Sequence, residues 1–198
     1  MNKTSLSFMI MLTCFIILSV GFAGCTSQAP PVSKTSTIEP SEMALQTSEY
    51  PANFTLVEKA ERNSSTVADW GIAHGWKKGY FALYQTNDPV SPPGTVIGQY
   101  ISVYPVENIT LVIPDTKSGL KNWTIETDKV NLSVEDLSSP GIGDSSSAMK
   151  IFDKSDNTEM YVISFIKKDV YQDFWTNGTA RDFETIRNLA GIAAAKIK

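Results

Sequence analysis

The sequence has little of what several common functions require. It has two cysteines and one histidine in 198 residues, and 17 basic residues against 21 acidic ones. Without an excess of positive charge, it lacks the electrostatic footprint of a nucleic-acid-binding protein. The cysteines, Cys14 and Cys25, lie near the N-terminus. One histidine leaves mainly oxygen ligands for a metal, and the acidic residues show no calcium-loop spacing, so we expect neither a metal nor another cofactor.

Catalytic motifs are missing as well. There is no Gly-x-Ser-x-Gly elbow and no glycine-rich phosphate loop. The run Gly143-Asp144-Ser145 is similar to the motif of GDS-type hydrolases, but no late Asp-x-x-His follows it. His74 lies far upstream, and although Asp69 is near it in sequence, a lone histidine is more often structural. We therefore expect no enzyme, a strand-entry turn at 143–145, and solvated carboxylates at Asp169 and Asp173.

The N-terminus has the pattern of an export signal. Lys3 precedes an apolar run over 6–22 and the small residues 23–24. The segment 22–25 resembles a lipobox, with Phe22 in place of the usual Leu, and predicts lipidation at Cys25. A run of about 17 apolar residues is also at the short end for a retained signal anchor. Either alternative places the remaining chain at the extracytoplasmic face of the cell membrane.

Six glycosylation sequons support an exported protein. Nine asparagines follow the signal, and chance predicts roughly two sequons among them. A lipobox together with many sequons fits an archaeal cell-surface lipoprotein better than a bacterial one. The candidate glycosylation sites are Asn53, Asn63, Asn108, Asn122, Asn131 and Asn177.

Composition divides the chain into three parts. Residues 1–24 are the predicted signal peptide. Residues 25–47 are rich in Ser, Thr and Pro and predict a lipid-attached, extended tether. Residues 48–198 predict one globular domain, since about 150 residues are enough to bury a single core.

The globular part alternates with a period of two over most of its length, which predicts strands. Turn-forming residues separate these runs, and short turns such as the one at 155–157 favour antiparallel hairpins. We predict strands at 54–59, 80–86, 95–104, 130–134, 148–152, 159–167 and 170–174. Residues 70–76 fit either a strand or a loop.

Two helices complete the predicted elements. Thr179 and Asp182 have the spacing of a capping box, and apolar residues then recur on one face of an amphipathic C-terminal helix. A second helix is predicted over 106–120, broken or kinked near Pro114 because proline lacks an N–H donor. The predicted fold class is α+β, an antiparallel sheet packed against helices.

Aromatic side chains are the main candidates for a binding surface. Flat rings with polar edges suit both sugar stacking and protein contacts, although packing in the core is the commoner fate of such residues. A ligand pocket between sheet and helix would be lined by some of Trp70, Trp76, Tyr80 and Tyr84. Trp123 and Trp175 lie next to sequons and are expected to be the more exposed tryptophans.

The C-terminal half resembles a known superfamily. The run Gly141-Ile142-Gly143-Asp144-Ser145, the strand 161–170, Gly178 and the closing helix at 189–193 follow in an order similar to that of the PsbP-like superfamily, which includes the LpqN and DcrB lipoproteins. The resemblance covers about residues 135–198, and the N-terminal half only by element order. It implies an α/β/α sandwich used largely as a non-catalytic module.

These observations favour a membrane-tethered extracytoplasmic lipoprotein that acts as a non-catalytic protein-binding or assembly module. Its protein partner is not identified by any motif. The alternative function is binding of a small molecule or glycan at the cell surface. Changes in tryptophan fluorescence on ligand addition would distinguish the two.

Overall fold

The computed structural model describes residues 34–86, 94–126, 132–155, 157–177 and 180–198. Residues 33–198 form a compact unit separate from residues 1–32. The signal peptide, Cys25, Asn131 and Thr179 lie outside the described ranges. The contacts within residues 33–198 make this unit compact by itself, and the three hydrophobic clusters of the described residues fill it, so we expect it to fold without the N-terminal segment.

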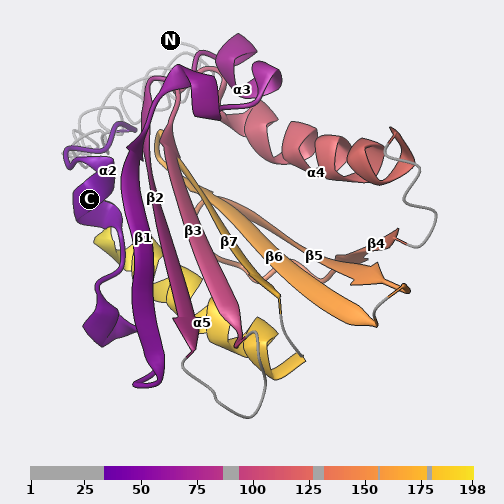
Figure 1. The fold of residues 1–198 in the computed structure, drawn as a ribbon. Helices are drawn as coiled ribbons and strands as arrows, with labels where there is room; N and C mark the ends of the chain where they lie inside the picture. The colour runs from indigo at the N-terminus through magenta and orange to yellow at the C-terminus, as the bar shows by residue number, and fades with distance from the viewer. Residues whose placement is uncertain (1–33, 87–93, 127–131, 156, 178–179) are drawn as a thin grey trace, which may run out of the picture. The chain divides into compact units, whose positions relative to one another are not determined.

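The centre of the fold is a seven-stranded sheet in the order β1-β2-β3-β7-β6-β5-β4, in which all neighbouring strands are antiparallel (Figure 1). All seven predicted strands are confirmed, and so is the α+β class. The strands are β1 (Phe54–Arg62), β2 (Lys78–Thr86), β3 (Val96–Val103), β4 (Leu132–Leu137), β5 (Ser145–Asp153), β6 (Thr158–Lys167) and β7 (Val170–Asn177).

One face of the sheet is covered by α5 (Ala180–Lys196). Alternate residues of β3, β6 and β7, such as Ile97, Phe165 and Phe174, form one continuous core with this helix. The predicted amphipathic helix is confirmed, because its apolar residues belong to or pack against that core. These residues are Phe183, Ile186, Leu189, Ala190, Ala193 and Ile197. We call this side the α5 face.

The opposite side, the α4 face, carries α3 (Asp69–Ala73) and α4 (Ile109–Glu126) (Figure 1). Its buried residues form two smaller clusters, one under the start of α4 and one over β5 and β6. Residues 70–76, predicted as strand or loop, instead contain α3. No helix within the described ranges is long and apolar enough to span a membrane.

Helix α4 runs through Pro114 without ending there, so of the predicted break or kink the break is wrong. Proline removes only the bond that residue 114 would donate to the carbonyl of Thr110. Thr110 is exposed, which lets water satisfy that carbonyl. Val112 is fully buried against the sheet, and this packing holds the second turn of the helix in place.

The segment 34–50 is folded onto the domain, so the boundary predicted at residue 48 is too late. It contains α2 (Pro40–Met43) and the short helix η1 (Thr47–Glu49). Leu45 is 1% exposed, its N–H donates to Gln99 Oε1 at 3.0 Å, and its carbonyl accepts from the Tyr84 hydroxyl at 2.9 Å. Composition suggested a tether because polar residues outnumber the apolar ones in this segment. The few apolar residues nevertheless pack in the core.

Two turns match their sequence-based predictions. Gly143 has φ +67°, and a Cβ there would lie 2.3 Å from the Ile166 carbonyl oxygen. Asp144 accepts the Lys168 N–H at 2.7 Å. The hairpin between β5 and β6 turns through Asn157 at φ +58°. Residues 143–145 therefore form the predicted strand-entry turn, which leads into β5 at Ser145. A short helix, η2 (Ser64–Thr66), follows β1.

Candidate functional site

An apolar groove of about 430 Å³ lies on the α4 face, between α3, α4 and strands β3, β6 and β7. Six of its nine lining residues are aromatic or aliphatic, and most are half-buried. It is lined by Trp70, Tyr100, Thr116, Gly119, Leu120, Met160, Val162, Asp173 and Trp175. The groove exists because α4 leaves part of this sheet face uncovered by helix side chains.

Glycines shape the walls of this groove. A Cβ on Gly98 would lie 2.2 Å from Trp175 Nε1, so the indole ring lies directly on the backbone of β3. Gly119 of α4 approaches Trp70 Nε1, which would be 3.9 Å from a Cβ at that position. The two tryptophans thus line the groove from the sheet and from the helical layer.

Tyr100 occupies the floor next to Asp173, its direct neighbour across the β3–β7 ladder. Its ring stacks on Phe81 with a centroid separation of 4.7 Å, and the Arg62 guanidinium lies 4.9 Å from its centroid. These contacts fix the orientation of the ring. Arg62 also donates to Ser102 Oγ at 3.2 Å, which holds the guanidinium against the sheet.

A chain of buried hydroxyls leads to Asp173, the one charged residue among the described lining residues of the groove. Ser164 Oγ donates to Asp173 Oδ1 at 2.5 Å. The Tyr171 hydroxyl lies 3.4 Å from Ser164 Oγ and donates to Thr116 Oγ1 at 3.1 Å. The protein therefore holds Asp173 at Oδ1, and Tyr100 and Thr116 are the other polar side chains of the described lining.

Burial raises the pKa of Asp173, although the hydroxyls of Ser164 and Tyr171 and the charge of Arg62 act to lower it. Burial also raises the pKa of Tyr171 well above its ordinary value, so this residue stays a neutral hydroxyl. A desolvated carboxyl gains most from a partner that donates a hydrogen bond or carries a positive charge.

Helix α3 is fastened to α4 beside the groove. His74 Nε2 lies 2.5 Å from Asp115 Oδ2, and Asn108 Nδ2 donates to the His74 carbonyl at 3.1 Å. Asp115 rather than Asp69 is therefore the partner of the single histidine. Because Trp70 is on the same short helix, this pair helps to fix the position of one wall of the groove.

The candidate ligand residues predicted from sequence do not form one site. Trp70 lines the groove, whereas Trp76 packs in the core under α4 and donates to Ser102 Oγ at 3.2 Å. Tyr80 and Tyr84 belong to the α5 face. Tyr84 is 3% exposed and stacks on another buried tyrosine, so it is a core residue.

Sequence reasoning misplaced the carboxylates. Asp169 is 3% exposed and accepts the Ser36 N–H at 2.6 Å, and Asp173 lines the groove, so neither is solvated surface. Trp175, expected to be exposed, is half-buried in the groove. A signal was available, because Tyr171, Asp173 and Trp175 alternate along β7 and must share one face of the sheet.

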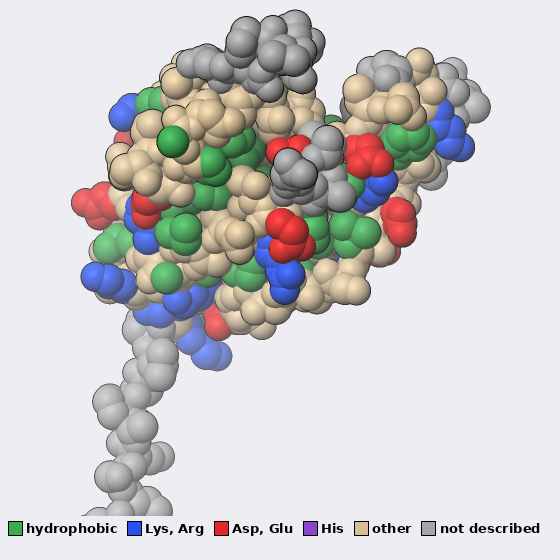
Figure 2. All heavy atoms as spheres, turned by 90° about the horizontal axis from the view of Figure 1, so that it is seen from below, with side chains coloured by type: hydrophobic (Ala, Val, Ile, Leu, Met, Phe, Trp, Pro, Cys, Tyr) green, Lys and Arg blue, Asp and Glu red, His purple; other side chains and the backbone are tan. Residues whose placement is uncertain are grey.

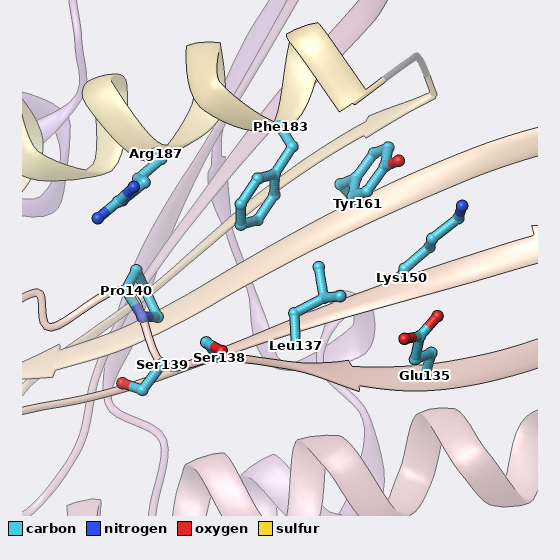
Figure 3. Close-up of a pocket in the computed structure, with 9 residues that line it drawn as sticks. All are labelled: Glu135, Leu137, Ser138, Ser139, Pro140, Lys150, Tyr161, Phe183 and Arg187. Carbon is cyan, nitrogen blue, oxygen red and sulfur yellow. The ribbon is translucent and has the colours of Figure 1, made fainter.

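A second cleft, of about 490 Å³, lies on the α5 face between α5 and strands β4 to β6 (Figure 3). Several of its polar groups have partners within the protein. Lys150 bonds Glu159, which holds the pKa of that carboxyl below its usual range, and the Tyr161 hydroxyl donates to Glu159 at 2.6 Å. Phe183 packs on the Tyr161 ring. The described lining of this cleft has three charged side chains, those of Glu135, Lys150 and Arg187, against one in the groove, so the groove is the more apolar of the two.

No group of three or more potential metal-ligating side chains occurs within the described part of the chain. On the face seen in Figure 2, acidic and basic side chains lie in small groups with hydrophobic side chains between them. That face offers no extended surface of one charge.

The candidate glycosylation sites differ in accessibility. Those that are described and exposed are Asn53, Asn63, Asn122 and Asn177. Asn108 is half-buried and uses its Nδ2 atom, the atom that a glycan would modify, in the bond to His74. The structure therefore favours the four exposed positions.

The described part of the chain has the architecture of an antiparallel sheet with helices on both faces. This fold is shared with a solved structure, the extracellular domain of PknH from Mycobacterium tuberculosis. The TM-score is 0.57 at 12% identity, and the match covers 83% of this chain and 96% of that one. Neither a protein-family model nor a curated protein matches the sequence.

Proposed function

We propose that this protein is an extracytoplasmic, membrane-tethered binding domain whose groove on the α4 face holds a small and largely apolar molecule. The bound molecule carries one hydrogen-bond donor or positive charge that faces Asp173. The observation that carries this proposal is the combination of an apolar groove with a single, partly bonded carboxyl in its wall. Small-molecule sites commonly have this composition.

The polarity of the groove narrows the ligand class. A glycan presents many hydroxyl groups, and each needs a partner when it is desolvated. The polar side chains that line the groove are those of Tyr100, Thr116 and Asp173. An aromatic or aliphatic ligand with one polar end fits this set better than a sugar does. The small-molecule function, the alternative in the sequence analysis, thus becomes the leading one.

The groove supports binding rather than catalysis. Its described lining has no histidine, cysteine, serine or lysine, and a nucleophile requires a base within hydrogen-bonding reach. Within the described part of the chain, the His74 ring bonds Asp115 of α4. We therefore propose a non-catalytic module, which agrees with what the PsbP-like resemblance implies.

The proposed location rests on the N-terminal sequence and receives support from the solved neighbour, which is itself an extracellular domain. Replacing Cys25 by Ser tests the anchor. If Cys25 is lipidated, C25S loses the lipid mass and the mature N-terminus at residue 25. If the signal is instead retained as an anchor, C25S differs from the wild type only by the mass of the exchanged atom and stays attached to the membrane.

Two related dyes test the groove. N-phenyl-1-naphthylamine is apolar with one N–H donor, and 8-anilino-1-naphthalenesulfonate has the same rings plus an anionic sulfonate. We expect residues 33–198 to bind the first dye and to bind the second more weakly, because Asp173 disfavours an anion. Fluorescence titration measures both affinities.

Matched variants locate the dye. Trp175→Ala removes a groove wall and should reduce affinity about tenfold or more, whereas Trp76→Phe changes a tryptophan outside the groove and should leave affinity unchanged. Equal effects of both variants, or equal affinity for both dyes, would contradict the proposal.

A further inference from the structure

Strand β1 forms one edge of the sheet and is unusually open. It is nine residues long, and its residues from Thr55 to Glu61 are all exposed. Within the described chain it pairs with β2 on one side only (Figure 1). An edge of this kind presents unpaired backbone N–H and C=O groups that can pair with another strand.

The charges on β1 restrict which strand can pair there. Residues 58–62 read Glu-Lys-Ala-Glu-Arg. If two copies of β1 pair antiparallel about Ala60, Lys59 of each copy lies opposite Glu61 of the other. Directly opposed residues of unlike charge stabilise a strand pair, and like charges destabilise it.

Other registers of the same pairing are unfavourable. Centring the pair on residue 59 places Lys59 opposite Lys59, and centring it on residue 61 places Glu61 opposite Glu61. A centre at residue 58 or 62 likewise opposes two identical charges. Charged residues thus disfavour the registers centred on residues 58, 59, 61 and 62. They favour the register centred on Ala60.

The bulge in β1 limits the length of the contact. The register of β1 against β2 shifts between Leu56 and Glu58, and a bulge twists and interrupts a strand edge. The regular stretch is thus 58–62. Arg62 lies over the Tyr100 ring and donates to Ser102, so its charge is directed toward β3 and away from the open edge. The contact depends on Lys59, Ala60 and Glu61.

We propose that two copies of this protein associate through β1, antiparallel and two-fold symmetric about Ala60, so that their sheets join into one. The two identical Lys59–Glu61 contacts that this places across the interface are the isologous pattern expected of a C2 dimer. A five-residue edge contact is small, so the dimer is a weak one. This proposal does not depend on the ligand groove.

Charge exchange tests the pairing. Sedimentation velocity of residues 33–198 over a range of concentrations measures self-association. We expect K59E and E61K each to weaken it about tenfold or more, because each creates two like-charge contacts. The double variant K59E/E61K should recover association. E107K changes an exposed charge outside β1 and should leave association at the wild-type level.

Disulfide trapping tests the register. Residues 33–198 contain no native cysteine, so A60C introduces a single thiol that faces its own copy across the two-fold axis, within disulfide range. We expect covalent dimers of A60C and none of T55C. Wild-type protein that stays monomeric, a double variant that does not recover, or equal trapping of T55C overturns the proposal. Capture of a different protein at β1 without self-association overturns it too.

Discussion

The two faces of the sheet are built from the same alternating strands but are covered differently. On the α5 face, α5 and the segment around Leu45 fill one continuous core. On the α4 face, the buried residues form two smaller clusters, and the surface beside them remains a groove. We therefore expect the first face to contribute more to stability, and the second carries the groove that we propose as the ligand site.

The pKa values of two carboxyl groups, one on each side of the sheet, are shifted in opposite directions. Burial alone would raise the pKa of Glu49, but the Gln46 N–H and Lys196 outweigh it, and the pKa is lowered. Lys196 Nζ lies 2.9 Å from Glu49 Oε2 and joins α5 to the N-terminal segment. In the groove, burial raises the pKa of Asp173, although the hydroxyls of Ser164 and Tyr171 and the charge of Arg62 act to lower it. The surroundings of Glu49 therefore stabilise its anionic form, whereas burial disfavours the anionic form of Asp173.

Neighbouring residues of β7 test the contrast between the faces most strongly. Phe174 is fully buried on the α5 face, and Trp175 is half-buried in the groove. We expect Phe174→Ala to lower the free energy of unfolding by about 3 to 5 kcal/mol, and Trp175→Ala by about 1 to 2 kcal/mol. Urea denaturation measures both. A larger stability loss for Trp175→Ala would reverse the roles assigned to the two faces.

Leu45 tests whether the N-terminal segment belongs to the core of the α5 face. Leu45→Ala should lower the free energy of unfolding by about 2 to 4 kcal/mol, because it leaves a cavity in packed surroundings. Ser48→Ala changes an exposed residue of the same segment and should have almost no effect. If both variants unfold like the wild type, residues up to 47 are a tether after all.

Asp173 tests the electrostatics of the groove. Asp173→Asn keeps the bond from Ser164 and removes the charge, so affinity for N-phenyl-1-naphthylamine should fall about tenfold, while affinity for its sulfonated analogue should rise. Because the folded pKa of Asp173 is raised, the wild type loses stability relative to D173N as pH rises from the unfolded value through the folded one. Parallel stability curves for the two proteins would contradict the assigned shift.

Glu49 should show the opposite dependence on pH and a smaller effect. Its lowered pKa contributes stability above the unfolded value of about 4.3, and this stability is lost as pH falls through the folded value. Glu49→Gln should cost about 0.5 to 1 kcal/mol near neutral pH. The difference from wild type, measured by denaturation at several pH values, should vanish in acid.

The fold followed from the sequence where local pattern determines structure. Alternation located all seven strands, and apolar spacing located α5, because each pattern directly reports which side chains are buried. A break or kink of helix α4 was predicted because Pro114 was considered without the packing of Val112, which is a tertiary effect. The role of Leu45 was missed for the same reason, since its polar partners Gln99 and Tyr84 are far away in sequence.

The groove was less predictable than the fold. Trp70 was identified as a candidate, but Tyr80 and Tyr84 lie on the opposite face of the sheet. Alternation along β2 puts both tyrosines on the same face, and the position of β2 in the sheet determines which face that is. Asp173 was interpreted as solvated because its environment depends on strand order, which brings β3 and β6 to either side of β7. Sequence patterns indicate which residues share a strand face, but they do not indicate which strands are neighbours.

Fluorine NMR of residues 33–198 labelled with 5-fluorotryptophan tests the central claim, that the α4 face carries the ligand site. The chain has four tryptophans, and single Trp→Phe variants assign their signals. On titration with N-phenyl-1-naphthylamine, we expect the signals of Trp70 and Trp175 to move together along one saturable curve while the Trp76 signal stays fixed. Saturable dye binding that leaves both Trp70 and Trp175 unmoved would place the site elsewhere and contradict the account.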